Sequence, residues 1–245
     1  MKTAKIDLHL HLDGSLYLPW AYETAIKRGV VPSDYTFEEY YERYYQKNFK
    51  DRTESIKKFD FPVSILQTKE DISDAVYYLV RTLHEQEMIY AEIRFATQQH
   101  TQCGLTQKEA MLAAIDGMHR AEKDFPDVIV RLINCMMHKG EDAHANYEAN
   151  LETIEVVREL MGQGVVGLDL AGYENNGDFL LYAPLFEKAR EYHIPYTMHA
   201  GEMGIGKHVL DALEMKAHRI GHGVNAVQNE SYLKAVVETQ IPLEV

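Results

Sequence analysis

The chain has few cysteines and no long apolar run. Its two cysteines among 245 residues, Cys103 and Cys135, supply neither a disulfide framework nor a cysteine-ligated zinc site. No apolar run approaches the roughly 18 residues needed to cross a bilayer, so we expect no membrane partner. The N-terminus passes from Met1 into a charged strand without an apolar leader or a small-residue cleavage site, which predicts a cytoplasmic protein.

Positive charge is also scarce. The 25 lysines and arginines are outnumbered by 38 aspartates and glutamates, which gives a formal net charge of −13. Because such a surface repels phosphate groups, we expect no nucleic acid partner. A small molecule is the expected partner, and the sequence leaves the oligomeric state open.

Strand-like apolar runs alternate with helical patterns such as Lys108–Lys123 and Tyr147–Met161. The strand-like runs are Ile6–Leu10, Tyr90–Ala96, Val128–Met136, Val165–Ala171, Pro195–Met198, Arg219–Gly221 and Ile241–Val245. This alternation predicts an α/β fold with a parallel sheet, and the serial repeat favours a TIM (β/α)8-type barrel. An open doubly wound sheet is disfavoured because no glycine-rich phosphate fingerprint follows the first strand.

Residues 19–82 separate the first two strand-like runs and are too numerous for a simple crossover. We predict that they form a helical insertion that acts as a lid over the barrel mouth. Phe59–Pro62 is the stronger candidate for the lid, with a break in the chain at Pro62. Aromatic residues in this segment form a stripe that helix packing explains better than ligand contact: Tyr40, Tyr41, Tyr44, Tyr45 and Phe49.

The last strand-like run, Ile241–Val245, reaches the end of the sequence. A (β/α)8 barrel would continue with a helix, an eighth strand and a closing helix, on the order of 40 residues. We therefore expect residues 1–245 to form a single barrel domain that is truncated around its seventh strand.

Two histidines lie at the end of the first strand-like run, His9 within it and His11 directly after it. His9 and His11 are two residues apart, and such residues point to the same side of a strand. Asp13 and Gly14 follow directly. Two imidazoles on one side make half of a metal site, and the alternative is a chance surface pair. Further histidines at later strand ends favour the metal site.

His199 and His222 directly follow the fifth and sixth runs, and the carboxyl ends of barrel strands open onto the active-site face. A catalytic zinc needs about three protein ligands and an open position for water. The alternative for His199 is a hydrogen-bonded core histidine. Glu202 follows closely enough to exchange a proton with a substrate. His222 is placed to act on a water whose pKa zinc lowers.

Asp169 lies near the end of the fourth run, and Gly172 directly follows that run. Gly172 can offer its backbone N–H to a substrate, whereas a structural role explains Asp169 at least as well. No lysine lies at this strand end, which weakens an interpretation as a binuclear amidohydrolase whose modified lysine bridges two metals.

The chain resembles the adenosine deaminase family in four segments that occur in the family's order and span nearly the whole sequence. These segments are HLHLDGSL at residues 9–16, LDLAG at 168–172, MHAGE at 198–202 and RIGHG at 219–223. The resemblance implies attack of hydroxide at purine C6 and loss of ammonia, which converts adenosine, and also deoxyadenosine, into inosine products in purine salvage.

The resemblance also implies a role for each matched residue. His9, His11 and His199 are expected to bind one zinc ion per chain. Glu202 is expected to give a proton to purine N1, and His222 to act on the hydrolytic water.

Two further matched residues are expected to bind the nucleoside. Asp13 would contact the ribose, and the Gly172 N–H would contact the purine. Adenine-specific relatives tend to have Glu in place of Asp13 and Asp in place of Gly221, so a nucleoside is the preferred substrate.

One family segment, similar to Ser-Leu-Asn-Thr-Asp-Asp-Pro, does not occur in these 245 residues. In the family it would supply a further zinc-binding aspartate and a purine-binding aspartate, and no residue here is assigned to either role. We therefore expect weak turnover or none. The alternatives are a truncated or degenerate, non-catalytic relative, a deaminase of adenine or another purine, or a metal-dependent hydrolase of a non-nucleoside amide or ester.

Overall fold

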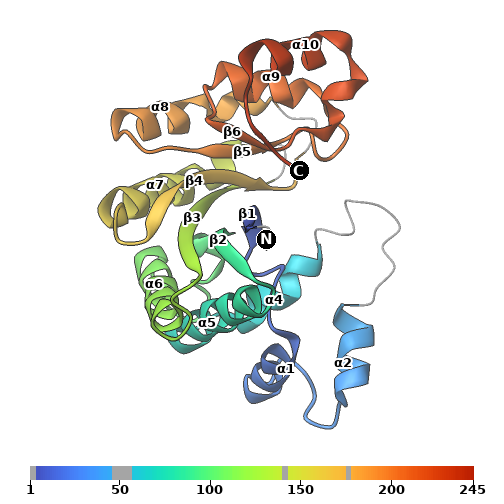
Figure 1. Ribbon diagram of the computed structural model, residues 1–245, viewed down its shortest axis with the longest axis vertical. Helices are drawn as coiled ribbons and strands as arrows, with labels where there is room; N and C mark the ends of the chain where they lie inside the picture. The colour runs from blue at the N-terminus through green and yellow to red at the C-terminus, as the bar shows by residue number, and fades with distance from the viewer. Residues whose placement is uncertain (1–3, 46–56, 140–142, 175–177) are drawn as a thin grey trace. The chain divides into compact units, whose positions relative to one another are not determined.

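The computed structural model describes residues 4–45, 57–139, 143–174 and 178–245 (Figure 1). Two compact units make up the chain, Met1–Leu132 and Ile133–Val245, and the boundary between them falls within the third strand. No helix in the described ranges is long and apolar enough to span a membrane.

The strands of the described residues follow the order expected from the apolar runs. They are β1 (Lys5–His11), β2 (Met88–Phe95), β3 (Ile129–His138), β4 (Val165–Gly172), β5 (Thr197–Ala200), β6 (Arg219–His222) and β7 (Leu243–Glu244). Each lies within two residues of the predicted run at both ends, including the short β7, which begins two residues later and ends one residue earlier. The predicted positions of the strands are thus confirmed.

Helices occupy the connections between these strands. The α-helices are α1 (Leu18–Lys27), α2 (Phe37–Tyr44), α4 (Asp60–Ile65), α5 (Lys69–Glu85), α6 (Gln107–Asp124), α7 (Tyr147–Leu160), α8 (Ala183–Glu191), α9 (Lys207–Glu214) and α10 (Glu230–Thr239). The short 3-10 helices are η1 (Lys57–Phe59), η2 (Thr97–Gln99), η3 (Ala143–Asn146), η4 (Phe179–Tyr182) and η5 (Val224–Gln228). The two predicted helices correspond to α6 and α7.

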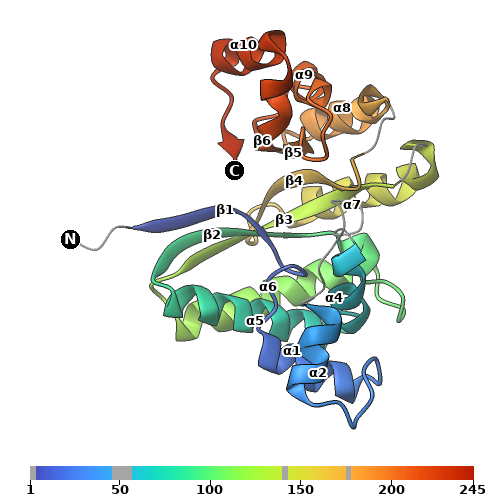
Figure 2. The ribbon, with the colours of Figure 1, turned by 90° about the vertical axis from the view of Figure 1, so that its right-hand side faces the viewer.

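In the first unit, β1 and β2 are parallel neighbours, and His11 is paired with Arg94 at the carboxyl end of the pair. Helices α5 and α6 lie side by side (Figures 1 and 2). Their close approach requires a glycine, because a Cβ atom at Gly117 would lie 2.1 Å from the carbonyl oxygen of Ser73. At the start of α6, Thr106 and Glu109 form a capping box that satisfies backbone N–H groups.

The described residues between β1 and β2 form the helices α1, α2, η1, α4 and α5, which non-helical segments separate, in agreement with the predicted helical insertion. Tyr40 of α2 is fully buried, and its ring contacts those of Tyr22 and Phe61 at centroid distances of 5.3 and 5.7 Å. The position of Tyr40 is therefore explained by packing between helices, as the sequence analysis predicted for the aromatic stripe. Phe49 lies outside the described residues.

The predicted break at Pro62 is wrong. Helix α4 begins at Asp60 and continues through Pro62 to Ile65. Pro62 stands in the first turn of the helix, where a backbone N–H has no partner within the helix and proline is therefore tolerated.

In the second unit, β4 leads into a parallel set of short strands. The Leu168 N–H donates to the carbonyl of Pro195, 3.0 Å away, next to an isolated parallel bridge between Leu168 and Tyr196. Strands β5, β6 and β7 are parallel, and His199 and Ala200 are paired with Gly221 and His222. The carboxyl ends of β5 and β6 are therefore level with each other.

Candidate active site

In the first unit, His9 and His11 of β1 point their imidazoles to a common side. Their Nε2 atoms are 3.3 Å apart, and their ring centroids are 5.2 Å apart. Two nitrogens that each bind a tetrahedral zinc at about 2.0–2.1 Å are separated by about 3.3 Å. The spacing of these two atoms therefore fits two ligands of one zinc ion.

Asp13 follows β1 and is 5% exposed. Burial raises the pKa of Asp13 to about 7, although hydrogen bonds from the backbone N–H groups of Asp13 and Gly14 act in the opposite direction. Its Oδ1 atom has no hydrogen-bond partner among the described residues. A buried oxygen of this kind can accept a hydrogen bond from a polar ligand.

In the second unit, Asp169 of β4 lies against His199 of β5. The Asp169 Oδ2 atom is 2.9 Å from His199 Nδ1, and the side chains are 0% and 7% exposed. Carboxylates commonly orient metal-binding histidines through the ring nitrogen that does not bind the metal. A metal at His199 would then be bound through Nε2, and the position of Asp169 is explained by this contact.

Gly172 ends β4 with a φ of +112°, which is a backbone conformation that glycine adopts readily. A Cβ atom at this position would lie 2.6 Å from the carbonyl oxygen of His138 on β3. The close approach of the two backbones therefore requires a glycine here.

His222 ends β6 in a left-handed conformation, with a φ of 67°, and Gly223 follows with a φ of 68°. This conformation is uncommon for residues other than glycine. It accompanies a contact of 3.6 Å between His222 Nε2 and the Oε2 atom of Glu202. The ring of His222 is also 5.1 Å from that of His199, measured between centroids. The structure thus brings together three of the predicted residues in this unit.

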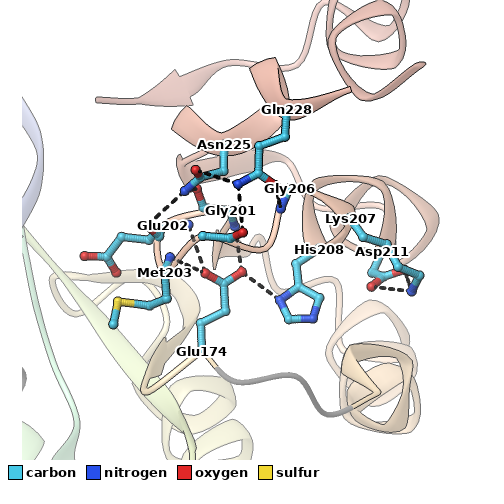
Figure 3. A network of polar contacts seen from close by, with 11 residues as sticks. Glu174, Gly201, Glu202, Met203, Gly206, Lys207, His208, Asp211, Asn225 and Gln228 are labelled. Atoms are coloured by element: carbon cyan, nitrogen blue, oxygen red, sulfur yellow. Dashed lines mark hydrogen bonds and ion pairs between the residues drawn. The ribbon is translucent and has the colours of Figure 1, made fainter. Parts of the chain in front are cut away.

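Sequence reasoning missed one residue near Glu202. The buried carboxylate of Glu174 accepts hydrogen bonds from the backbone of the segment that contains Glu202 (Figure 3). The only signal in the sequence is an acidic residue two positions after the LDLAG segment, at a strand end.

Comparisons with known proteins identify the family of this chain. The family model described as adenosine deaminase matches residues 4–245. The adenosine deaminase of Haemophilus ducreyi is 37% identical over 246 residues, which cover 98% of this chain and 70% of that protein. The adenosine deaminase of Clostridium perfringens strain 13 is 35% identical over 247 residues, which cover 100% of this chain and 73% of that protein.

Among solved structures, the adenine deaminase from Arthrobacter aurescens matches with a TM-score of 0.82 at 24% identity, over 97% of this chain and 70% of that chain. This likeness shows the fold, which is that of the TIM-barrel deaminases and hydrolases. The chain belongs to the adenosine deaminase family. The fold class and the family predicted from the sequence are both confirmed.

Proposed function

We propose that this chain hydrolyses adenosine, and also deoxyadenosine, at purine C6 to give the inosine product and ammonia. The observation that carries the proposal is the level alignment of β5 and β6, which brings His199, Glu202 and His222 together within the motifs of the family. Membership of the adenosine deaminase family supports the choice of reaction.

We propose that His9, His11 and His199 hold one zinc ion. The spacing of the His9 and His11 nitrogens supports this proposal, as does the orientation of His199 by Asp169. When bound, zinc supplies a water nucleophile near neutral pH by lowering the pKa of that water.

Two side chains, Glu202 and His222, are proposed to transfer the protons of the reaction. Glu202 gives a proton to N1 of the purine, which makes C6 more electrophilic, and His222 orients and deprotonates the attacking water. The 3.6 Å contact between the two side chains supports a shared reaction centre. Both are only partly exposed, at 31% for Glu202 and 27% for His222.

Substrate recognition would come from Asp13 and Gly172. Asp13 is proposed to bind the ribose through its buried carboxyl group, and the Gly172 N–H to bind the purine ring. Asp13 and Gly221 favour a nucleoside over free adenine, as the comparison of motifs predicts. The cytoplasmic location is likewise a proposal from the sequence.

Product analysis tests this proposal. The purified, zinc-loaded chain is incubated separately with adenosine, deoxyadenosine and adenine, and the purine products and ammonia are quantified. We expect equal amounts of inosine and ammonia from adenosine, and much less product from adenine. Hypoxanthine from adenine as the main product would favour an adenine deaminase, and no product from any purine would favour a non-catalytic relative.

A further inference from the structure

Glu174 makes an unusual set of contacts with the segment after β5. Its Oε1 atom accepts a hydrogen bond from the Gly201 N–H at 2.7 Å. Its Oε2 atom accepts from the Glu202 N–H at 2.9 Å and from the Met203 N–H at 2.7 Å. One carboxylate therefore binds three successive backbone N–H groups (Figure 3).

A fourth contact comes from helix α9. The Nδ1 atom of His208 lies 2.7 Å from Glu174 Oε1, and the His208 ring stacks on Phe179 at 4.6 Å between centroids. Burial raises the pKa of Glu174, but the hydrogen bonds from His208, Met203 and Gly201 outweigh that effect and leave the pKa below its ordinary value. The carboxylate is therefore charged at neutral pH, even though the residue is only 4% exposed.

Side chains after β6 hold the same segment through its carbonyl groups. The Nδ2 atom of Asn225 donates to the carbonyl oxygens of Gly201 and Glu202 at 2.8 and 3.0 Å. The Nε2 atom of Gln228 donates to the Gly204 carbonyl at 2.8 Å. The backbone around Glu202 is thus held by a carboxylate through its N–H groups and by amides through its carbonyl groups.

The side chain of Glu202 takes no part in these contacts. Only its backbone N–H and carbonyl groups are used by Glu174 and Asn225. Its carboxylate instead lies 3.6 Å from His222 and remains 31% exposed. The segment has no regular secondary structure that could fix it in place. The contacts of Glu174 and Asn225 therefore hold the main chain of Glu202 and do not use its carboxylate.

We propose that Glu174 is a positioning residue, which holds the backbone of residues 201–203 so that the Glu202 carboxyl group is aimed at the purine. This role rests on the proposed deaminase function. Burying a carboxylate costs free energy unless it is fully hydrogen-bonded. The donors to Glu174 are His208 and the backbone N–H groups of residues 201–203, which include the proposed proton donor Glu202. Preorganisation matters because a displacement of about 1 Å in a reacting group can reduce the rate on the order of 100-fold.

The test compares Glu174→Gln with Glu155→Gln. The glutamine at 174 keeps the size of the side chain but replaces one acceptor oxygen with a donor, which the backbone N–H groups cannot use. Glu155 on α7 is a matched control, because its carboxylate accepts from Tyr192 and Arg158 and contacts neither Glu202 nor its neighbours. Both variants are measured for amide exchange at residues 201–203, zinc content, kcat and KM.

We expect Glu174→Gln to lose kcat on the order of 100-fold, with little change in KM or zinc content. Exchange of the three amides should become at least about tenfold faster, because each loses a hydrogen bond to a charged acceptor. Glu155→Gln should match the wild type in all four measurements. If Glu174→Gln does not fold, Glu174→Asp is measured in the same way, since it keeps the charge but withdraws it by one methylene group.

Unchanged exchange at residues 201–203 would overturn the inference, and so would faster exchange with an unchanged kcat, which would make Glu174 a structural anchor only. A wild-type chain that forms no inosine would instead contradict the proposed function. In that case the exchange measurement still decides whether Glu174 holds the segment, because it does not depend on turnover.

Discussion

Asp169 Oδ2 and His199 Nδ1 lie 2.9 Å apart on the neighbouring strands β4 and β5, and both side chains are almost completely buried. The same carboxylate accepts a weak hydrogen bond from the Cys135 thiol at 3.8 Å. Because the contact involves Nδ1, it fixes the orientation of the ring and leaves Nε2 as the atom through which a metal would bind. Asp169 belongs to the LDLAG segment, but the sequence assigned it no catalytic or binding role. This contact links it to the proposed zinc site through His199.

Replacement of Asp169 by asparagine should weaken zinc binding. The amide keeps the volume of the side chain but lacks the negative charge that supports the imidazole, and losing such a partner typically costs about 10- to 100-fold in metal affinity. Competition with a chromophoric chelator measures the affinity, and circular dichroism verifies the fold. An affinity equal to that of the wild type would show that Asp169 has a structural role only.

His11→Ala should remove a zinc ligand. We expect a larger loss of affinity than the about 10- to 100-fold attributed to a supporting residue. Metal analysis after dialysis measures the effect. His84→Ala is the control, since His84 is a half-exposed histidine of the same unit that pairs with Asp127. Undiminished zinc in His11→Ala would count against its role as a ligand.

Glu202→Gln should separate metal binding from chemistry. The amide cannot donate the proton that the purine needs, so kcat should fall by about 100- to 10,000-fold. Zinc content should stay at the wild-type value because Glu202 is not a proposed ligand. Stopped assays of inosine formation, together with metal analysis of the same samples, measure both quantities. Equal activity of the variant and the wild type would exclude the role of Glu202 as proton donor.

His100 should make the stability of the protein depend on pH. It is fully buried, its Nδ1 atom donates to the Leu66 carbonyl at 2.8 Å, and burial lowers its pKa from 6.5 to about 4. The unfolded chain therefore takes up a proton at a higher pH than the folded chain does. The free energy of unfolding should fall between pH 6.5 and 4, by up to about 3 kcal/mol.

Urea unfolding of the wild type and of His100→Gln across this pH range measures the effect. The glutamine does not titrate, so the variant should lose less stability on acidification. His84→Gln is the control and should follow the wild type. If the free energy of unfolding fell equally with pH in His100→Gln and the wild type, protonation of His100 would not be the cause of the loss of stability.

The sequence was sufficient to predict the repeating strands and the residues at their carboxyl ends. Apolar runs identify the positions of β1 to β7, and the positions of His199 and His222 at strand ends follow from that assignment. The spacing of two residues between His9 and His11 also predicts that both side chains lie on the same side of β1. These features depend on local patterns, which a single sequence displays.

The contacts of Asp169 and Glu174 could not be predicted in the same way. Asp169 meets a residue 30 positions later, and Glu174 bonds to backbone groups 27 to 29 positions away, so no local periodicity records either contact. The break predicted at Pro62 was wrong because proline interrupts a helix in its interior but is tolerated in its first turn. The sequence alone did not show that a helix begins at Asp60.

Titration of the metal-free chain with zinc, with inosine formation from adenosine measured at each step, tests the central claim most directly. The account predicts that activity rises with zinc and reaches its maximum at about one ion per chain. Inosine formation that is independent of zinc would contradict the proposed metal site. A chain that binds one zinc ion and forms no inosine above the level of Glu202→Gln would contradict the proposed function.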